Sequence, residues 1–186
     1  NTVVTNRATG NALLSYMSYA GNKINNNILV ATTGTTYAMY IANVSTAYFT
    51  SLDYNTLKVP TGSPNMAYWG GSTVSTIAAL KALNATFNQN NNDVQPVFQS
   101  ATNLHLSTAV DQARGIAGLG INVDIDGDAR CIFAPSIGAD ESGYITAPPT
   151  AGYTVGTVYV NSPTTFLNNY SALLPMSHRW YLDGVF

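Results

Sequence analysis

Short β-prone runs alternate with turn residues through the first third of the chain, and the runs recur at a nearly constant interval. Asn1-Thr-Val-Val, Asn27-Ile-Leu-Val and Asn55-Thr-Leu-Lys all begin with asparagine, at spacings of 26 and 28 residues. Further apolar runs, such as residues 37–41, lie between them and are separated by turns such as Gly21-Asn22. A repeat of this length predicts a solenoid, in which stacked coils of the chain bury a shared core.

The asparagines fit the corners of such a solenoid. At equivalent corners of stacked coils an Asn adopts the left-handed conformation readily, and its side chain hydrogen-bonds to the next coil. The triplet Asn25-Asn26-Asn27 is the best candidate for such a corner. The alternative is a set of ordinary surface loops that happen to be rich in Asn.

One stretch interrupts the strand pattern with helical spacing. Ser75 is the expected N-cap of a short amphipathic helix that presents Ile77, Leu80 and Leu83 at intervals of three, before Asn84 ends it. The polar run 88–93 is expected to be a loop, and residues 97–98 and 104–106 read as short strands.

From residue 146 the composition changes to that of a linker. We expect a β-helix over residues 1–145, a linker over 146–152 and the start of another module over 153–186. Runs 155–160, 164–167 and 179–182 read as its strands and resemble the opening of a PKD-like or immunoglobulin-like β-sandwich. Both ends of the chain lie in strand-like runs, so we expect it to be a piece of a longer polypeptide.

Composition narrows the function classes. The 186 residues are 46% hydrophobic but only 9% charged, with a net charge of −2, which excludes the disorder signature and offers no basic footprint for nucleic acid. Cys131 is the single cysteine, so no internal disulfide forms, and we expect it to be a buried apolar residue. No apolar run reaches the roughly 18 residues of a membrane-spanning helix.

The acidic residues are concentrated in one segment. Asp124-Ile-Asp-Gly-Asp-Ala-Arg130 and Ile137-Gly-Ala-Asp-Glu141 together hold five of the nine carboxylates of the chain. Asp124, Asp126 and Asp128 could converge on Ca²⁺, a hard cation that prefers oxygen ligands. The favoured interpretation is structural: Arg130 pairs with Asp140 or Glu141 and locks the end of the solenoid, while Asp124 or Asp126 accepts backbone amides at the turn.

These motifs resemble a known family. The chain is similar to the C-terminal end of secreted, choice-of-anchor right-handed parallel β-helix proteins (pectin-lyase-like) of Bacteroidota. The resemblance covers roughly residues 1–145 and rests on Asp53-Tyr-Asn55, Tyr68-Trp69, Asn103-Leu-His-Leu106 and above all the Asp-Gly-Asp-x-Arg and Gly-Ala-Asp-Glu pair. It implies an all-β fold, namely a right-handed parallel β-helix with one short helix and then a partial sandwich. It also implies export across the outer membrane to the cell surface, but it supplies no activity.

A few other residues are candidates for catalysis or ligand binding. His105 and His178 are expected to be solvent-facing or bonded in turns, since neither shows a catalytic partner in the sequence. Lys23 and Asp53 are the nearest approach to a catalytic pair in the coils. Several tyrosines either fill coil corners and interior stacks or form a platform for glycans: Tyr16, Tyr19, Tyr37, Tyr40, Tyr48 and Tyr68.

We therefore expect a non-catalytic segment of a large secreted or cell-surface protein, acting as a rigid stalk, an adhesin or a filament component. Its partners are then extracellular glycans or other surface modules. The alternative is a polysaccharide lyase, a glycosidase or a carbohydrate-binding β-helix whose active coils lie partly upstream. Hydrolases of this kind need paired carboxylates, which these coils do not offer in an obvious arrangement.

Overall fold

The computed structural model describes residues 1–108 and 110–141, and the backbone of residues 153–155 and 166–168. It divides the chain into two compact units, Asn1–Tyr144 and Ile145–Phe186. The described secondary structure consists mainly of short strands, with the single helix α1 (Ile77–Ala82), so the chain is of the mainly-β class. The division lies beside the predicted boundary at 145, while the predicted linker 146–152 lies outside the described residues.

The asparagine-led repeats form one parallel sheet. Its strands β1 (Thr2–Thr5), β4 (Ile28–Ala31) and β7 (Thr56–Lys58) pair in the order β1-β4-β7. Thr2 is opposite Ile28, and Ile28 is opposite Thr56, so the pairing register equals the repeat read from the sequence. Because parallel neighbours need a long connection, other strands fill each interval.

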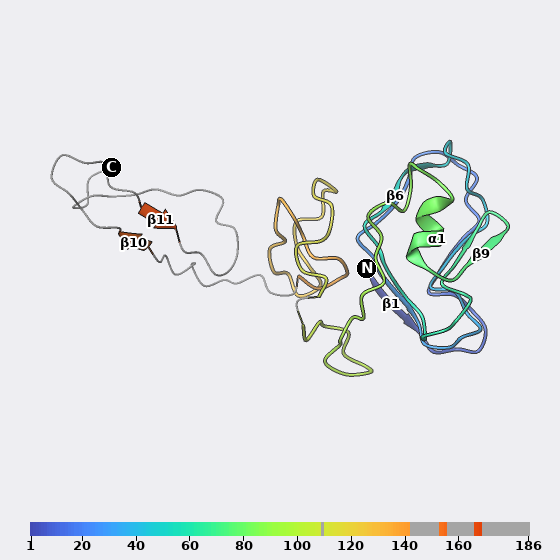
Figure 1. Ribbon diagram of the computed structural model, residues 1–186, viewed down its shortest axis with the longest axis horizontal. Coiled ribbons are helices and arrows are strands. Elements are labelled where there is room, and N and C mark those ends of the chain that lie inside the picture. The colour runs from blue at the N-terminus through green and yellow to red at the C-terminus, as the bar shows by residue number, and fades with distance from the viewer. Residues whose placement is uncertain (109, 142–152, 156–165, 169–186) are drawn as a thin grey trace. The chain divides into compact units, whose positions relative to one another are not determined.

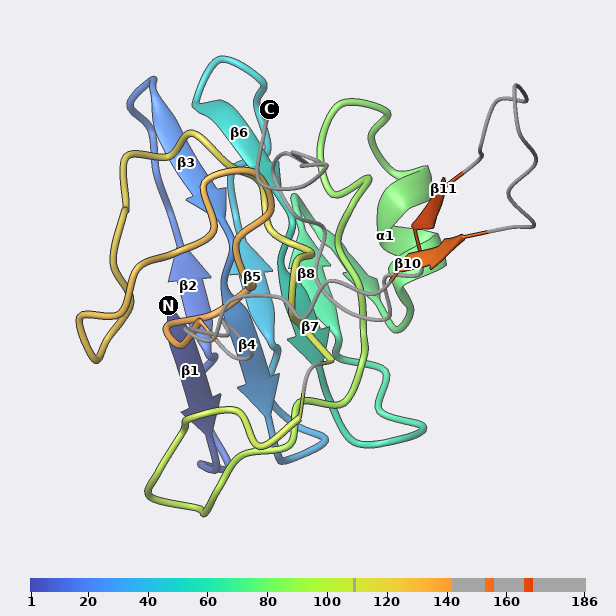
Figure 2. The same ribbon diagram turned by 90° about the vertical axis from the view of Figure 1, so that its left-hand side faces the viewer.

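Two more parallel pairings repeat the same order. One sheet runs β2-β5-β8 and ends with β9 antiparallel to β8, and β3 pairs in parallel with β6. Their bounds are β2 Leu13–Ser15, β3 Asn22–Asn25, β5 Met39–Ile41, β6 Phe49–Asp53, β8 Ala67–Trp69 and β9 Ser72–Val74. We call β1, β2 and β3 the first strand set, β4, β5 and β6 the second, and β7 with β8 the third; Figure 2 shows the sets one after another.

The core lies between these sheets. Leu29 and Leu57, which occupy equivalent positions of β4 and β7, are 1% and 0% exposed, and they join a cluster that includes Met39, Leu52 and Trp69. All four residues of β4 are buried because its other face, which carries Ile28 and Val30, is covered as well. A strand buried on both faces explains the uninterrupted apolar run Ile-Leu-Val-Ala.

A row of asparagines, buried except at Asn1, crosses the strand sets. Asn1 Nδ2 donates to Asn27 Oδ1 at 3.1 Å, Asn27 Nδ2 donates to Asn55 Oδ1 at 2.9 Å, and Asn55 N donates to Asn91 Oδ1 at 2.7 Å. We call Asn1, Asn27, Asn55 and Asn91 the asparagine ladder. As expected, these asparagines bond from one strand set to the next, but the left-handed residues are the preceding ones, Asn26 (φ 56°) and Tyr54 (φ 57°).

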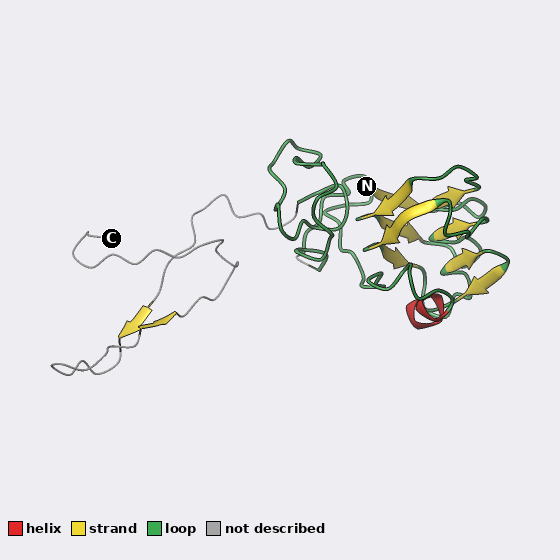
Figure 3. Cartoon of the chain, turned by 90° about the horizontal axis from the view of Figure 1, so that it is seen from above, coloured by secondary structure: helices red, strands yellow, loops and turns green. Residues whose placement is uncertain are grey.

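Helix α1 follows the third strand set and lies beside it (Figures 1 and 3). Its N-cap is Thr76, whose hydroxyl accepts from Ala79 N at 3.1 Å, so the expectation of Ser75 was wrong by one residue. Leu80 is fully buried and Ile77 is packed against the core, but Leu83 is 44% exposed. The helix ends before Leu83 can turn inward, and only part of the predicted apolar face is used.

The run 88–93 is a loop, as predicted, but two of its four asparagines are buried rather than solvated. Asn88 and Asn91 are 0% and 2% exposed, and Asn92 O accepts from Leu57 N at 2.8 Å. This loop and α1 therefore cover the third strand set. The predicted strands at 97–98 and 104–106 make a single antiparallel bridge, between Phe98 and Leu106.

In the second unit the structure describes two antiparallel strands, β10 (Tyr153–Val155) and β11 (Phe166–Asn168). They overlap the predicted runs 155–160 and 164–167 only in part. The predicted strand 179–182 and the proposed β-sandwich lie outside the described residues, as does His178.

Candidate functional site

Residues 97–108 and 110–141 form a loop-rich segment that we call the lobe; in Figure 1 it is drawn in yellow to orange. Leu106 and Ile137 of the lobe pack against Ile28 and Val30 on the outer face of β4, with Val4 of β1 beside them. The acidic motifs were expected to lock an end of the solenoid. The lobe instead covers the side of the β1-β4-β7 sheet, because Ile28 and Val30 present an apolar outer face there.

Gly138 allows the lobe to approach this sheet closely. It has a φ of +108°, and a Cβ at this position would lie 2.7 Å from Ile28 Cδ1 and 2.9 Å from Thr2 Oγ1. The next residue, Ala139, donates its N–H to Thr2 Oγ1 at 3.0 Å, and Gly138 N donates to Asn26 O at 3.0 Å. The glycine of the Gly-Ala-Asp-Glu motif is therefore needed for backbone contact with two strand sets.

Asp124 organises the acidic turn through its carboxylate. Asp124 Oδ1 accepts from the N–H groups of Asp126 and Asp128, both at 2.9 Å, and Oδ2 accepts from Glu141 N at 3.0 Å. Burial raises the pKa of this carboxyl, but the three backbone donors and the charge of Arg130 outweigh burial, so the pKa lies below its ordinary value. Asp124 thus ties the Asp-Gly-Asp turn to the Gly-Ala-Asp-Glu motif.

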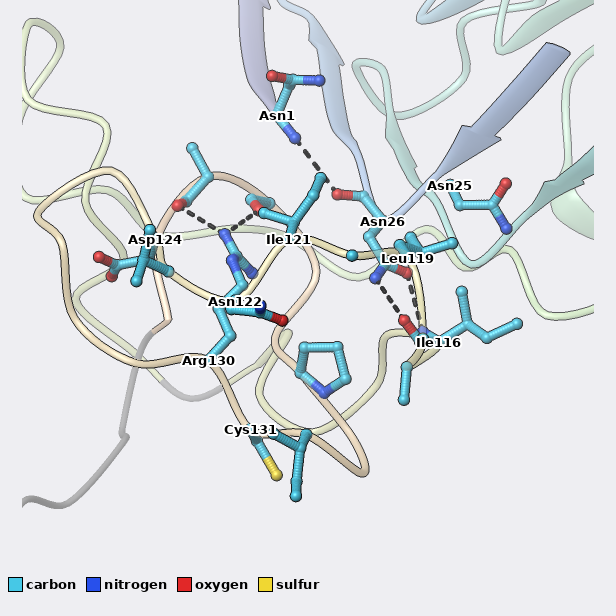
Figure 4. Close-up of a pocket in the computed structure, with 18 of the residues that line it drawn as sticks. Asn1, Asn25, Asn26, Ile116, Leu119, Ile121, Asn122, Asp124, Arg130 and Cys131 are labelled. Carbon is cyan, nitrogen blue, oxygen red and sulfur yellow. Dashed lines mark hydrogen bonds between the residues drawn. The ribbon is translucent and has the colours of Figure 1, made fainter.

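Arg130 is buried at the centre of the lobe. Its Nη1 contacts Glu141 Oε2 at 3.2 Å, with the two side chains 9% and 3% exposed. Nη2 donates to the carbonyls of Gly138 and Ala139 at 2.8 and 2.7 Å (Figure 4). Nη1 also donates to Ser136 O at 3.2 Å. Of the two partners expected for Arg130, it contacts Glu141.

Asp140, the other expected partner, lies elsewhere. Its Oδ2 accepts from Leu106 N at 2.8 Å and so joins two parts of the lobe. Asp140 also comes close to Asp124 and Asp126: one carboxylate oxygen of each lies within 4.8 Å of the others. Asp128, which the sequence grouped with Asp124 and Asp126 as calcium ligands, is not in this group.

These three carboxylates have the chemistry of a hard-cation site, since Ca²⁺ takes oxygen ligands from Asp side chains. Each already accepts a hydrogen bond from the protein, and Asp126 Oδ2 lies 2.8 Å from His105 Nε2. The donors offset much of the carboxylate repulsion, so the lobe keeps the turn folded with its own groups.

His105 has partners at both ring nitrogens. Nδ1 contacts Asn103 Oδ1, and Nε2 contacts Asp126 Oδ2 at 2.8 Å. Both partners are acceptors, so both contacts are hydrogen bonds only when both nitrogens carry protons. The sequence showed no partner for His105; the structure supplies Asp126 but leaves neither nitrogen available to act as a general base.

A buried carboxylate at Asp111 was not singled out from the sequence. It is 0% exposed, and its Oδ1 accepts from Thr56 Oγ1 of β7 at 2.6 Å. Burial raises the pKa of Asp111, against the smaller opposing effects of the Thr56 hydrogen bond and Arg114. Its Oδ2 is buried without a partner among the described residues. No local pattern pointed to it, because Thr56 lies 55 residues away.

Two hollows lie between the lobe and the region where β1 begins and β3 ends. One, of about 480 Å³, is lined by Asn1 and Asn25 on one side and by Ile121, Arg130 and Cys131 on the other (Figure 4). The second, of about 520 Å³, includes Thr2 and His105, and both hollows share Ile125 and Ala139. We call the two together the β1 groove. Cys131, expected to be buried, is partly exposed here.

The lining of the β1 groove is mixed. Aliphatic side chains such as Ile121, Val123 and Ile132 lie beside polar ones such as Asn122 and Asp124. The aliphatic part is the part that an apolar occupant would cover.

The tyrosines lie on the outer side of the β2-β5-β8 sheet. Tyr40 and Tyr68 are in register and stacked, with ring centroids 4.2 Å apart and 5° between the planes. Tyr16 is 5.8 Å from Tyr40, and Tyr37 meets Tyr40 and Tyr68 edge-on. The faces of Tyr40 and Tyr68 pack on one another, as expected for tyrosines that fill a stack.

The remaining candidates for catalysis do not form a site. Lys23 is exposed and pairs in register with Ser51, whereas the Asp53 carboxylate is buried and accepts from Asn90 N at 2.6 Å and Asn90 Nδ2 at 2.8 Å. Asp53 therefore holds the 88–93 loop. Within the described ranges, no helix has the length and apolar character needed to cross a bilayer.

Comparison with models of known protein families, with curated proteins and with solved structures found no match to this chain.

Proposed function

We propose that this chain is a non-catalytic segment of a larger secreted or cell-surface protein, acting as a rigid stalk or adhesin. In this proposal the strand sets are consecutive coils of a right-handed parallel β-helix, and the lobe braces their side. The setting is that implied by the sequence resemblance, a protein exported across the outer membrane of a Bacteroidota-type bacterium.

The parallel pairing of successive strand sets carries the proposal. β1, β4 and β7 pair at intervals set by the asparagine-led repeat, and the asparagine ladder runs through the same positions. A backbone stacked in this way has few independent motions, because each coil contacts its neighbours along its whole length. Rigidity of this kind suits a spacer at a cell surface.

The chemistry of the lobe supports a structural role. Its central ion pair, Arg130 with Glu141, is largely buried, and both side chains also bond to backbone groups. Catalytic carboxylate pairs need room for substrate or water between them, at separations of roughly 5–9.5 Å. The carboxylates of Asp124, Asp126 and Asp140 lie closer than that and bond to protein donors.

The test is the size and location of the native protein. We expect the intact mass of the protein from its source to be many times the 19.7 kDa of this chain. We also expect protease treatment of whole cells to release peptides from residues 1–141. A native mass near 19.7 kDa, with hydrolysis or cleavage of a polysaccharide by the purified protein, would favour the lyase or glycosidase alternative instead.

A further inference from the structure

The first strand set leaves the core open at one end. Val3 of β1 is in register with Leu29 of β4, which in turn is in register with Leu57 of β7. Leu29 and Leu57 are 1% and 0% exposed, but Val3 is 37% exposed. An apolar side chain at a core position is therefore uncovered, and only at the β1 end of the row.

The opposite end is closed by the chain itself. Leu57 N donates to Asn92 O at 2.8 Å, and Asn55 N donates to Asn91 Oδ1 at 2.7 Å. Leu80 of α1 and Phe87 are buried against the same core. At this end β7 therefore bonds to the 88–93 loop and β8 pairs with β9, whereas no described strand pairs with the outer side of β1 or β2. Such edges are ready to pair with another strand.

The lobe extends beyond β1 and keeps an apolar surface there. Over β4 the lobe buries Ile28 and Val30 under Ile137 and Leu106. The β1 groove continues this interface past Thr2. No described strand packs against its aliphatic side chains, and Ile121, Val123, Ile125 and Ile132 are 65%, 53%, 67% and 64% exposed. A strand beside β1 would place its outer side chains against them.

We propose that the β1 edge and groove receive one further coil, carried by the same polypeptide ahead of β1, whose first strand pairs in parallel with β1. This inference rests on the proposed function. The expected strand has an Asn that extends the asparagine ladder to Asn1, an inward side chain that covers Val3, and outward aliphatic side chains that fill the groove. The lobe then braces that coil as it braces β4.

A second copy of this chain fits less well. Parallel addition to β1 requires a strand whose far edge is free, and in the third strand set α1 and the 88–93 loop cover that edge. Two β1 edges could meet only in antiparallel fashion, which would not extend the asparagine ladder. Self-association is therefore an outcome of the experiment that would overturn the proposal.

The experiment adds a coil and uses Cys131 as the probe. Residues 27–54, the length of one repeat, are duplicated ahead of Asn1, and the reaction of Cys131 with a maleimide is followed by mass spectrometry. We expect the extended chain to have a higher Tm and to label at least about tenfold more slowly, since labelling then requires local opening.

A matched control carries Ile28→Ser and Val30→Ser in the added copy only. These changes keep the pairing and the inward side chains but remove the apolar contacts with the groove, so we expect Cys131 protection to be lost. If Cys131 is labelled at the same rate in the parent and extended chains, the proposal is overturned. It is also overturned if Cys131 of the parent chain becomes more protected as the protein concentration rises, because that would indicate self-association. If the extended chain does not fold, the same labelling is done on the native full-length protein, and a reactive Cys131 there overturns it.

This outcome is separate from that of the proposed function. A native protein of small mass with polysaccharide-cleaving activity contradicts the stalk while the added coil still protects Cys131. Conversely, if the native protein is a large surface protein in which Cys131 reacts freely, the proposed function stands. The proposal that a further coil fills the β1 groove is then wrong.

Discussion

At the scale of single residues, the lobe depends on polar side chains that bond to backbone groups rather than on ion pairs alone. Three charged side chains, those of Asp124, Arg130 and Glu141, form hydrogen bonds with backbone groups of the lobe. The backbone groups belong to Asp126, Asp128, Cys131, Ser136, Gly138, Ala139 and Glu141. A segment with almost no regular strands has no ladder of its own to satisfy these groups, so the charged side chains serve instead.

Arg130→Ala is expected to destabilise the protein by about 3–5 kcal/mol, because Glu141 is left buried without its cation. Urea unfolding followed by circular dichroism gives this free energy. Arg7→Ala is the control, since Arg7 is exposed; we expect a change below about 0.5 kcal/mol. An unchanged midpoint for the Arg130 variant would remove the bracing role assigned to it.

Asp124→Asn tests the pH dependence of the acidic turn. The folded-state pKa of Asp124 lies below its ordinary value of 3.8, so its stabilising effect is complete above that value and disappears as the pH falls through the folded-state pKa. We expect the variant to be less stable than wild type at neutral pH and the difference to vanish in acid. Melting curves measured across the acid range show whether it does.

Asp111→Asn is expected to show a pH dependence of stability opposite to that of Asp124→Asn. Burial places the folded-state pKa of Asp111 above 3.8, so ionisation costs stability as the pH rises through that pKa. Relative to wild type, this variant should gain stability with rising pH. If the stabilities of both variants relative to wild type change with pH in the same direction, the causes given for the two pKa shifts are wrong.

At the scale of secondary-structure elements, the asparagine ladder and the cap of α1 connect local sequence to packing. Asn27 and Asn55 each follow a left-handed residue and immediately precede a strand, and each side chain bonds to the next ladder residue. Asn55 is 0% exposed and bonds to Asn27, Asn91 and the carbonyls of Ile24 and Asp53.

Asn55→Ala should therefore destabilise the strand sets strongly. Each buried group left without a partner costs about 1–3 kcal/mol, and this substitution removes the shared partner of several groups at once. Chemical denaturation compares it with Asn6→Ala, a change at an exposed asparagine just after β1. Similar stabilities for the two variants would mean that the ladder is incidental to the fold.

Thr76→Ala tests the helix cap. Loss of the bond from Ala79 N to the Thr76 hydroxyl should lower stability by about 1 kcal/mol, whereas Ser75→Ala should have almost no effect. The two adjacent hydroxyl residues make a matched pair, and thermal melting distinguishes them. A larger effect at Ser75 would restore the cap expected from the sequence.

At the scale of the whole molecule, one sheet is covered on both sides, by the common core and by the lobe. The outer polar groups of the lobe, including Asp124, Asp126 and Asp140, could serve this bracing with or without a cation. Protein groups already bond to each carboxylate, which favours bracing without a cation.

We accordingly expect EDTA to leave the Tm unchanged and millimolar CaCl₂ to raise it little, because a ligand stabilises only when its concentration exceeds its Kd. Calorimetric melting with each addition makes the comparison. A clear rise with calcium that is absent in Asp140→Asn would show instead that the three carboxylates hold the ion.

The sequence by itself determined the strand period, the asparagine corners, the presence of a short helix and the concentration of polar chemistry in one segment, because all of these follow from local spacing and turn preferences. Only the tertiary structure decided that the lobe lies on the side of the β1-β4-β7 sheet, that Asp140 rather than Asp128 joins Asp124 and Asp126, and that Tyr40 stacks on Tyr68. These contacts join residues far apart in the chain, such as Thr2 and Ala139 at a separation of 137. Local patterns do not record which distant surface an apolar strand face will meet, since that depends on how the whole chain packs.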